Sequence, residues 1–163
     1  LLLDAPLWEN AMLGHQTMEP FARGPLLDRG RSREATTRIV KDFDVRTPSI
    51  DTSARALSGG NQQKLVIGRE MAASPRLLIA AHPTRGIDVG AQAAVWEELR
   101  TARRNGLALL LVSADLEELL GLADRLVVML RGRVVAELDP GTTTPRQLGG
   151  YMTGAEDVTG DEE

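Results

Sequence analysis

The chain has 163 residues, 42% of them hydrophobic and 26% charged, which is enough for one ordinary globular domain with a hydrophobic core. Its net charge is −4, and five of its 23 acidic residues follow position 155, so the remainder is nearly neutral and offers no basic patch for nucleic acid. It contains no cysteine, which excludes disulfides and zinc–thiolate sites, and no apolar run approaches the roughly 20 residues of a membrane-spanning helix.

The first third of the chain is predicted to be helical and irregular. Residues 8–13 form a short apolar-containing turn, and prolines and glycines interrupt the chain between positions 20 and 25. Residues 31–43 then have the periodicity of an amphipathic helix. Its apolar face comprises Ala35, Ile39, Val40 and Phe43. We expect residues 1–56 to form part of a separate helical subdomain.

The rest of the chain alternates helices with apolar strands. Helices are expected at 61–73, 91–105, 116–123 and 145–151, and strands at 77–81, 107–112, 125–130 and 133–138. Gly106 is placed to end the second of these helices, and Arg131-Gly132 is the turn of a β-hairpin.

The apolar runs at 77–81 and 107–112 are typical of strands buried on both faces of a parallel sheet. Alternation of such strands with helices predicts an α/β fold, with a mostly parallel sheet flanked by helices, over residues 57–153. The acidic stretch at 154–163 is expected to be a disordered tail.

The most informative stretch is the octet LSGGNQQK at positions 57–64. Ser58 can cap the helix that follows, and Gly59 and Gly60 let a bulky ligand approach the backbone. Free N–H groups and the positive end of the helix dipole favour an anion there, phosphate in particular. Ser-Gly-Gly taken alone is more often a simple helix cap than a binding site.

The complete octet resembles the signature motif of the ATP-binding-cassette (ABC) ATPases, in the variant found in simple-sugar importers. The resemblance covers residues 1–152 and implies an α/β, partial P-loop NTPase fold with a helical signature subdomain. In that family the motif reaches across a pair of cassettes and contacts the γ-phosphate of ATP held by the other one. The resemblance therefore implies that Ser58, Gly59, Gly60 and Gln62 contact ATP.

Residues 77–88 stand where the family has its Walker B strand and D-loop. The family usually has an aspartate that helps hold Mg²⁺ and a glutamate that polarises the attacking water, but this sequence has Ala81 and His82 there. We expect no metal ligand here, and a lone histidine at a strand end is more often structural than catalytic. Asp88 matches the D-loop aspartate, which in the family runs along the cassette interface and helps couple the two ATP sites, so the resemblance places it with the nucleotide-binding residues. It is equally suited to cap the next helix. Ala114 occupies the place of the family's switch histidine.

The glycine-rich phosphate loop GxxxxGK[ST] is absent from the sequence, which begins with three leucines and no methionine. We expect the chain to be cut from a longer protein that carries this loop upstream of Leu1. The resemblance implies the rear part of the second cassette of an importer for simple sugars or nucleosides, and the Ala-Ala-x-Pro-Thr-Arg-Gly form resembles a branch linked to nucleoside uptake.

Such a subunit is peripheral, on the cytoplasmic face of the cell membrane, and uses ATP and Mg²⁺. Its expected partners are a second cassette, expected on the same chain, transmembrane permease subunits and, indirectly, an external solute-binding protein. The full-length protein is expected to hydrolyse ATP in support of transport.

The cassette's own ATP site is expected to hydrolyse ATP poorly or not at all, because three replacements fall on it and loss of a general base alone costs about 10²- to 10⁴-fold in rate. The signature motif is intact and would serve the opposite site. Two alternatives stay open: a non-transport ABC ATPase, and a nucleotide-free binding module as an isolated chain. The isolated chain is also expected to be inactive and to expose apolar surface.

Overall fold

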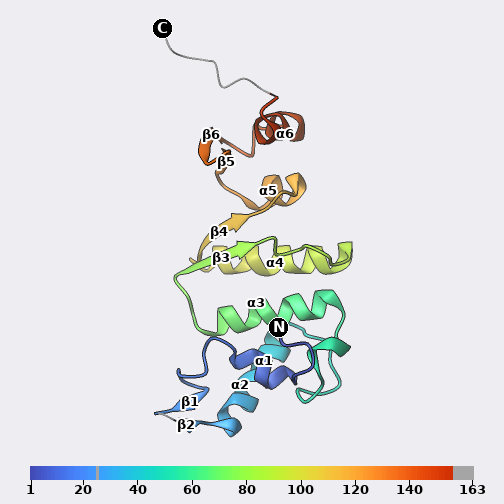
Figure 1. Ribbon diagram of the computed structural model, residues 1–163, viewed down its shortest axis with the longest axis vertical. Helices are drawn as coiled ribbons and strands as arrows, with labels where there is room; N and C mark the ends of the chain where they lie inside the picture. Colours follow the sequence, from blue (N-terminus) through green and yellow to red (C-terminus); the bar gives the residue numbers. More distant parts are fainter. Residues whose placement is uncertain (25, 156–163) are drawn as a thin grey trace. The chain divides into compact units, whose positions relative to one another are not determined.

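The computed structural model describes residues 1–24 and 26–155, which form two compact units (Figure 1). The first unit comprises Leu1–Leu78 and Pro83–Ala108, and the second comprises Ile79–His82 and the described residues from Leu109 onward. The predicted boundary between residues 56 and 57 stays a prediction. No helix in the described part of the chain is long and apolar enough to cross a membrane.

The first unit begins with helices around one core. Its elements are α1 (Leu7–Met12), the short antiparallel strands β1 (Ala22–Arg23) and β2 (Leu26–Leu27), α2 (Arg29–Asp42), the 3₁₀ turn η1 (Ala54–Ala56) and α3 (Gly59–Ala72). Asp28 caps α2 by accepting a hydrogen bond from the Arg31 N–H, so this helix begins two residues before the predicted start. The core comprises Leu7, Ala11, Ile39, Val45, Ala54, Leu57 and Leu65, with Val40 and Phe43 packed against it.

The predicted apolar face of α2 is therefore confirmed, because Ile39, Val40 and Phe43 all belong to this cluster. The close approach of α2 and α3 depends on Gly68, where a Cβ would lie 2.7 Å from the Ile39 Cγ2. This packing fixes α3, and with it the LSGGNQQK segment, against α2.

Helix α4 (Val89–Arg104) completes the first unit and buries Val95, Leu99 and Ala102, as its periodicity predicts. It ends at Gly106, which has φ of +92°, and the Leu107 N–H donates to the Ala102 carbonyl at 3.1 Å. This is the bonding of a Schellman motif, in which a glycine takes the left-handed conformation that ends the helix.

Strands β3 (Leu77–Ala81) and β4 (Ala108–Val112) pair with each other. The Ala108 N–H donates to the Arg76 carbonyl and the His82 N–H to the Val112 carbonyl, so the two strands run in the same direction. The strand–helix–strand unit predicted for residues 77–112 is thereby confirmed.

The expectation that these two strands are buried on both faces is wrong. Exposed and half-buried side chains alternate along each strand, and Leu77, Ile79, Leu110 and Val112 are each about half exposed. Alternate side chains of a strand lie on opposite faces of a sheet, so the exposed residues of each strand share one face. In the described residues this sheet has two strands, and that face is open to solvent. The expected exposure of apolar surface is accordingly observed.

The second unit continues from β4 with α5 (Leu116–Leu122), β5 (Leu126–Leu130), β6 (Arg133–Leu138) and α6 (Pro145–Thr153). Strands β5 and β6 form the predicted antiparallel hairpin, and Arg131 and Gly132 both have positive φ, as a two-residue hairpin turn requires. The hairpin packs on α6 through Leu126, Val128 and Leu148.

Helix α6 begins with a capping box formed by Thr144 and Gln147 and ends at Gly154, whose φ is +72°. Of the predicted disordered tail at 154–163, the first two residues thus complete the end of α6, and residues 156–163 lie outside the described residues.

Candidate functional site

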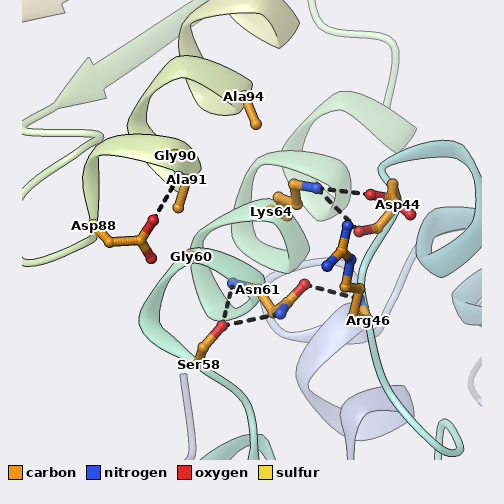
Figure 2. A pocket seen from close by; sticks show the side chains of 10 residues that line it. All are labelled: Asp44, Arg46, Ser58, Gly60, Asn61, Lys64, Asp88, Gly90, Ala91 and Ala94. Atoms are coloured by element: carbon orange, nitrogen blue, oxygen red, sulfur yellow. Dashed lines mark hydrogen bonds and ion pairs between the residues drawn. The ribbon is translucent and has the colours of Figure 1, made fainter.

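A pocket of about 470 Å³ opens in the first unit where the first turns of α3 and α4 meet (Figure 2). Its lining residues come from the two helices and from the loop that follows α2. They are Asp44, Arg46, Ser58, Gly60, Asn61, Lys64, Asp88, Gly90, Ala91 and Ala94. The pocket therefore brings together three residues predicted from sequence, Ser58, Gly60 and Asp88, with others that the sequence did not indicate.

Ser58 caps α3, as predicted. Its Oγ accepts hydrogen bonds from the Asn61 N–H at 3.4 Å and from the Asn61 Nδ2 at 2.9 Å. A hydroxyl has two acceptor positions and one hydrogen to donate, so both contacts leave the O–H of Ser58 available for a ligand. Gly59 and Gly60 follow at the start of the helix, where N–H groups have no partner within the helix.

The two glycines have a packing role in addition to the predicted one. A Cβ on Gly60 would lie 2.4 Å from the Cβ of Ala91, which no side chain tolerates, so Gly60 is required for the approach of α3 to α4. A Cβ on Gly59 would lie 3.3 Å from the Gly86 carbonyl oxygen, a tight but less severe contact.

Gln62 does not line the pocket. Its Nε2 donates to the carbonyls of Ala54 at 3.1 Å and Leu57 at 3.2 Å. The side chain thus holds the η1 turn against α3, which is a structural role that the motif alone did not reveal. Its contact with ATP stays a prediction.

Asp88 has the helix-capping role predicted for it, because its Oδ1 accepts from the Ala91 N–H at 2.9 Å at the start of α4. It also lines the pocket and is exposed. A carboxylate at this position offsets part of the positive end of the α4 dipole. The interface role of Asp88 stays a prediction.

His82 and Ala114 lie in the second unit, and neither lines this pocket. His82 is exposed, has φ of +50°, and its backbone N–H donates to Val112 at 2.8 Å, so it ends β3 in a left-handed conformation. Ala114 is exposed in the turn between β4 and α5. Within residues 1–24 and 26–155, no three acidic or histidine side chains are grouped so that they could hold a metal ion.

Sequence reasoning missed the loop that follows α2. Lys64 Nζ donates to the Asp44 carbonyl and carboxylate, both at 3.1 Å, and Asn61 Oδ1 accepts from the Arg46 N–H at 2.8 Å. Lys64 was visible as the last residue of the octet, but Asp44 and Arg46 belong to no recognised pattern. Nearby on α4, burial raises the pKa of Glu98, with the Lys64 charge opposing that shift and Glu97 adding to it.

Proteins similar in sequence are ATP-binding proteins of import systems. The chain is 45% identical over 155 residues to the guanosine import ATP-binding protein NupO of Bacillus subtilis, a match covering 95% of the chain and 30% of that protein. It is 41% identical over 157 residues to the ribose import ATP-binding protein RbsA 1 of Rubrobacter xylanophilus, covering 95% of the chain and 32% of that protein. The nucleoside import ATP-binding protein NupA of Lactococcus lactis is 38% identical over 154 residues, a match covering 94% of the chain and 30% of that protein.

The chain spans about 30% of the length of these curated relatives. No family model matches it. Solved structures with the same fold include a nucleotide-free ATP-binding cassette from an ABC transporter, at a TM-score of 0.70 and 20% identity, covering 93% of the chain and 60% of that chain. Another is a dimeric post-hydrolysis state of an ATP-binding cassette bound to ADP and Pi, with a TM-score of 0.69 and 21% sequence identity. That match covers 86% of this chain and 59% of the solved chain.

Proposed function

Because the chain belongs to the ATP-binding cassettes of ABC transporters, we propose that it is part of the ATP-hydrolysing subunit of an importer for simple sugars or nucleosides. The relatives support this class of solute, since they are named for the import of guanosine, ribose and nucleosides. The proposal places the subunit at the cytoplasmic face of the membrane, with permease subunits as partners and an external solute-binding protein acting through them.

The pocket at the start of α3 is proposed to receive the terminal phosphate of ATP held by a second cassette, which we place on the same chain. One observation carries this proposal: Ser58 uses both acceptor positions for Asn61 and keeps its O–H for an anion. The N–H groups at Gly59 and Gly60 and the positive end of the α3 dipole add to the attraction for phosphate. The sequence holds no GxxxxGK[ST] loop of its own, so the nucleotide would be supplied from elsewhere.

The site built on this cassette's own β3 strand is proposed to be impaired in hydrolysis. The residues do not fit Mg²⁺ there, because Ala81 has no polar side-chain atom and His82 offers nitrogen, whereas Mg²⁺ prefers oxygen ligands. Ala114 has no side-chain donor for a γ-phosphate. The two ATP sites of the cassette pair would then be unequal, and turnover would come from the site that this chain completes through Ser58.

The proposed role of the signature pocket is tested in the full-length subunit, assembled with its permease, by replacing Ser58 with arginine. We expect ATPase activity to fall at least about tenfold, since removal of one electrostatic donor to a reacting centre typically costs 10²- to 10³-fold. Thr37→Arg is the matched control, because Thr37 is an exposed hydroxyl on α2 outside the pocket. Equal turnover of the Ser58→Arg and Thr37→Arg proteins, both with a parent-like melting temperature, would refute the proposal.

The inequality of the two sites is tested by single-turnover hydrolysis. The full-length subunit is loaded with labelled ATP at both sites, excess nucleotide is removed, and the bound ADP and ATP are measured over time. About half of the bound ATP should be hydrolysed quickly and the remainder should persist, because loss of a general base slows hydrolysis about 10²- to 10⁴-fold. Complete hydrolysis in one kinetic phase would contradict an impaired site.

A further inference from the structure

The loop between α2 and η1 is held against α3 at three consecutive residues. Lys64 Nζ bonds both the backbone carbonyl and the carboxylate of Asp44, Val45 is buried in the helical core, and Asn61 Oδ1 accepts from the Arg46 N–H. The backbone of Arg46 is therefore fixed relative to the first turns of α3. A side chain on such a fixed backbone loses less entropy on binding than one on a free loop.

Arg46 is exposed and lines the pocket beside Asp44 and Lys64 (Figure 2), and within the part of the chain that the structure describes it forms no ion pair with a carboxylate. Some other arginines of this unit have acidic partners: Arg33 contacts Asp51, and Arg55 contacts Asp4. Among the acids lining the pocket, Asp44 is paired with Lys64, and Asp88 caps α4. Of the two cations that line the pocket, Lys64 and Arg46, only Lys64 thus has a carboxylate partner among the described residues.

We propose that Arg46 is a second contact for the terminal phosphate of the nucleoside triphosphate, beside Ser58. The proposal rests on the function proposed for the pocket. A guanidinium presents five N–H donors in a planar fork that suits two phosphate oxygens at once, which complements the single O–H of Ser58. Loss of Arg46 therefore weakens binding of a triphosphate more than binding of a diphosphate.

Asn61 is the residue that positions both proposed phosphate contacts, Ser58 and Arg46. Its Nδ2 donates to Ser58 Oγ at 2.9 Å, and its Oδ1 accepts from the Arg46 N–H at 2.8 Å. One amide side chain thereby links the hydroxyl donor to the backbone that carries the guanidinium. Removal of Asn61 loosens both at once, although Asn61 itself need not touch the nucleotide.

The test uses the full-length subunit assembled with its permease and measures KM for ATP, with Mg²⁺ in excess, and kcat. Arg46→Gln should raise KM about tenfold, the size expected for loss of one charge-assisted hydrogen bond. Arg46→Lys should raise KM less, because lysine keeps the positive charge but lacks the planar, forked donors of the guanidinium. Arg38→Gln is the control, since Arg38 is exposed on α2 outside the pocket.

The positioning role is tested with Asn61→Ala and the double variant. Asn61→Ala should raise KM as well, and Asn61→Ala with Arg46→Gln should raise it by less than the product of the two single effects, because both act on one contact. A KM for Arg46→Gln equal to that of Arg38→Gln would overturn the inference. If Ser58→Arg still lowers turnover at least about tenfold in that case, the proposed function stands without the Arg46 contact, and if Ser58→Arg has no effect, the proposed function itself has failed.

Discussion

Ala91 occupies the space that a side chain on Gly60 would need. A Cβ built on Gly60 would lie 2.4 Å from the Ala91 Cβ, so the first turns of α3 and α4 touch at this pair. The glycine that we propose to lie beside the phosphate is therefore also the residue that lets the two helices form one pocket. Packing, and in the proposed function also ligand approach, therefore depend on the same position.

Replacing Gly60 with alanine should destabilise the chain by about 1–3 kcal/mol, the usual cost of overpacking a close contact. Adding Ala91→Gly should restore much of the loss, because it removes the methyl group that the new side chain meets. Urea unfolding followed by circular dichroism measures both variants. Gly30→Ala is the control, since a Cβ there would lie 3.4 Å from the Asp28 Oδ1 at the exposed start of α2. The packing explanation fails if Gly60→Ala is as stable as the parent, or if Ala91→Gly adds a further loss.

Gln62 provides a second test, because the structure uses its side chain for folding. Gln62→Leu should cost about 1–3 kcal/mol, since it removes the side-chain donor from the Leu57 carbonyl and leaves the Ala54 carbonyl with the Leu57 N–H alone. Gln63→Leu, one residue further along α3, should have a smaller effect on the free energy of unfolding. Comparable losses in the two variants would show that the hydrogen bonds of Gln62 do not hold the η1 turn.

The sequence was sufficient for elements whose cause is local. Asp88 and Gly106 mark the start and end of α4 through capping chemistry, and Arg131-Gly132 marks the hairpin through its backbone conformation. It was insufficient for the burial of β3 and β4, because an apolar run shows that a strand can be buried but not what covers it. Ile79, for example, lies in an apolar run typical of a buried strand, and its side chain is exposed here.

The candidate site was predictable to the extent that one contiguous motif carries it. Ser58 and Gly60 were located from the octet alone, and both line the pocket. Arg46 was not, because it meets Asn61 across 15 positions of sequence and its neighbours show neither periodicity nor a motif. Pairings at that separation depend on how the loop packs, which local patterns do not encode.

The two roles of Asp88 can be separated by substitution. Asp88→Ala should lower the free energy of unfolding by about 0.5–2 kcal/mol, because the Ala91 N–H loses its acceptor, whereas Asp88→Ser should retain most of the stability. In the full-length subunit, ATPase activity then reports the other role. If Asp88→Ser keeps both stability and turnover, the residue acts as a helix cap alone, and if it keeps stability but loses turnover, the carboxylate itself is needed at the cassette interface.

The raised pKa of Glu98 on α4 predicts how the stability of the chain depends on pH. Burial raises the pKa of its carboxyl above the ordinary value of 4.5, so the folded chain binds this proton more tightly than the unfolded chain does. The stabilising contribution of that proton is fully present below pH 4.5 and is lost as the pH rises through the higher pKa of the folded state. Glu98→Gln removes the titration and should therefore raise the melting temperature at pH 7 relative to the parent.

The measurement is thermal unfolding of the parent and of Glu98→Gln at a series of pH values from 4.5 upward. The difference in melting temperature between the two proteins should grow with pH and then level off above the pKa that Glu98 has in the folded state. Glu34→Gln, which changes an exposed carboxyl on α2, should show no such growth. A difference for Glu98→Gln that is constant across the series would contradict a raised pKa of Glu98, and would mean either that the carboxyl is not desolvated or that the Lys64 charge balances its burial.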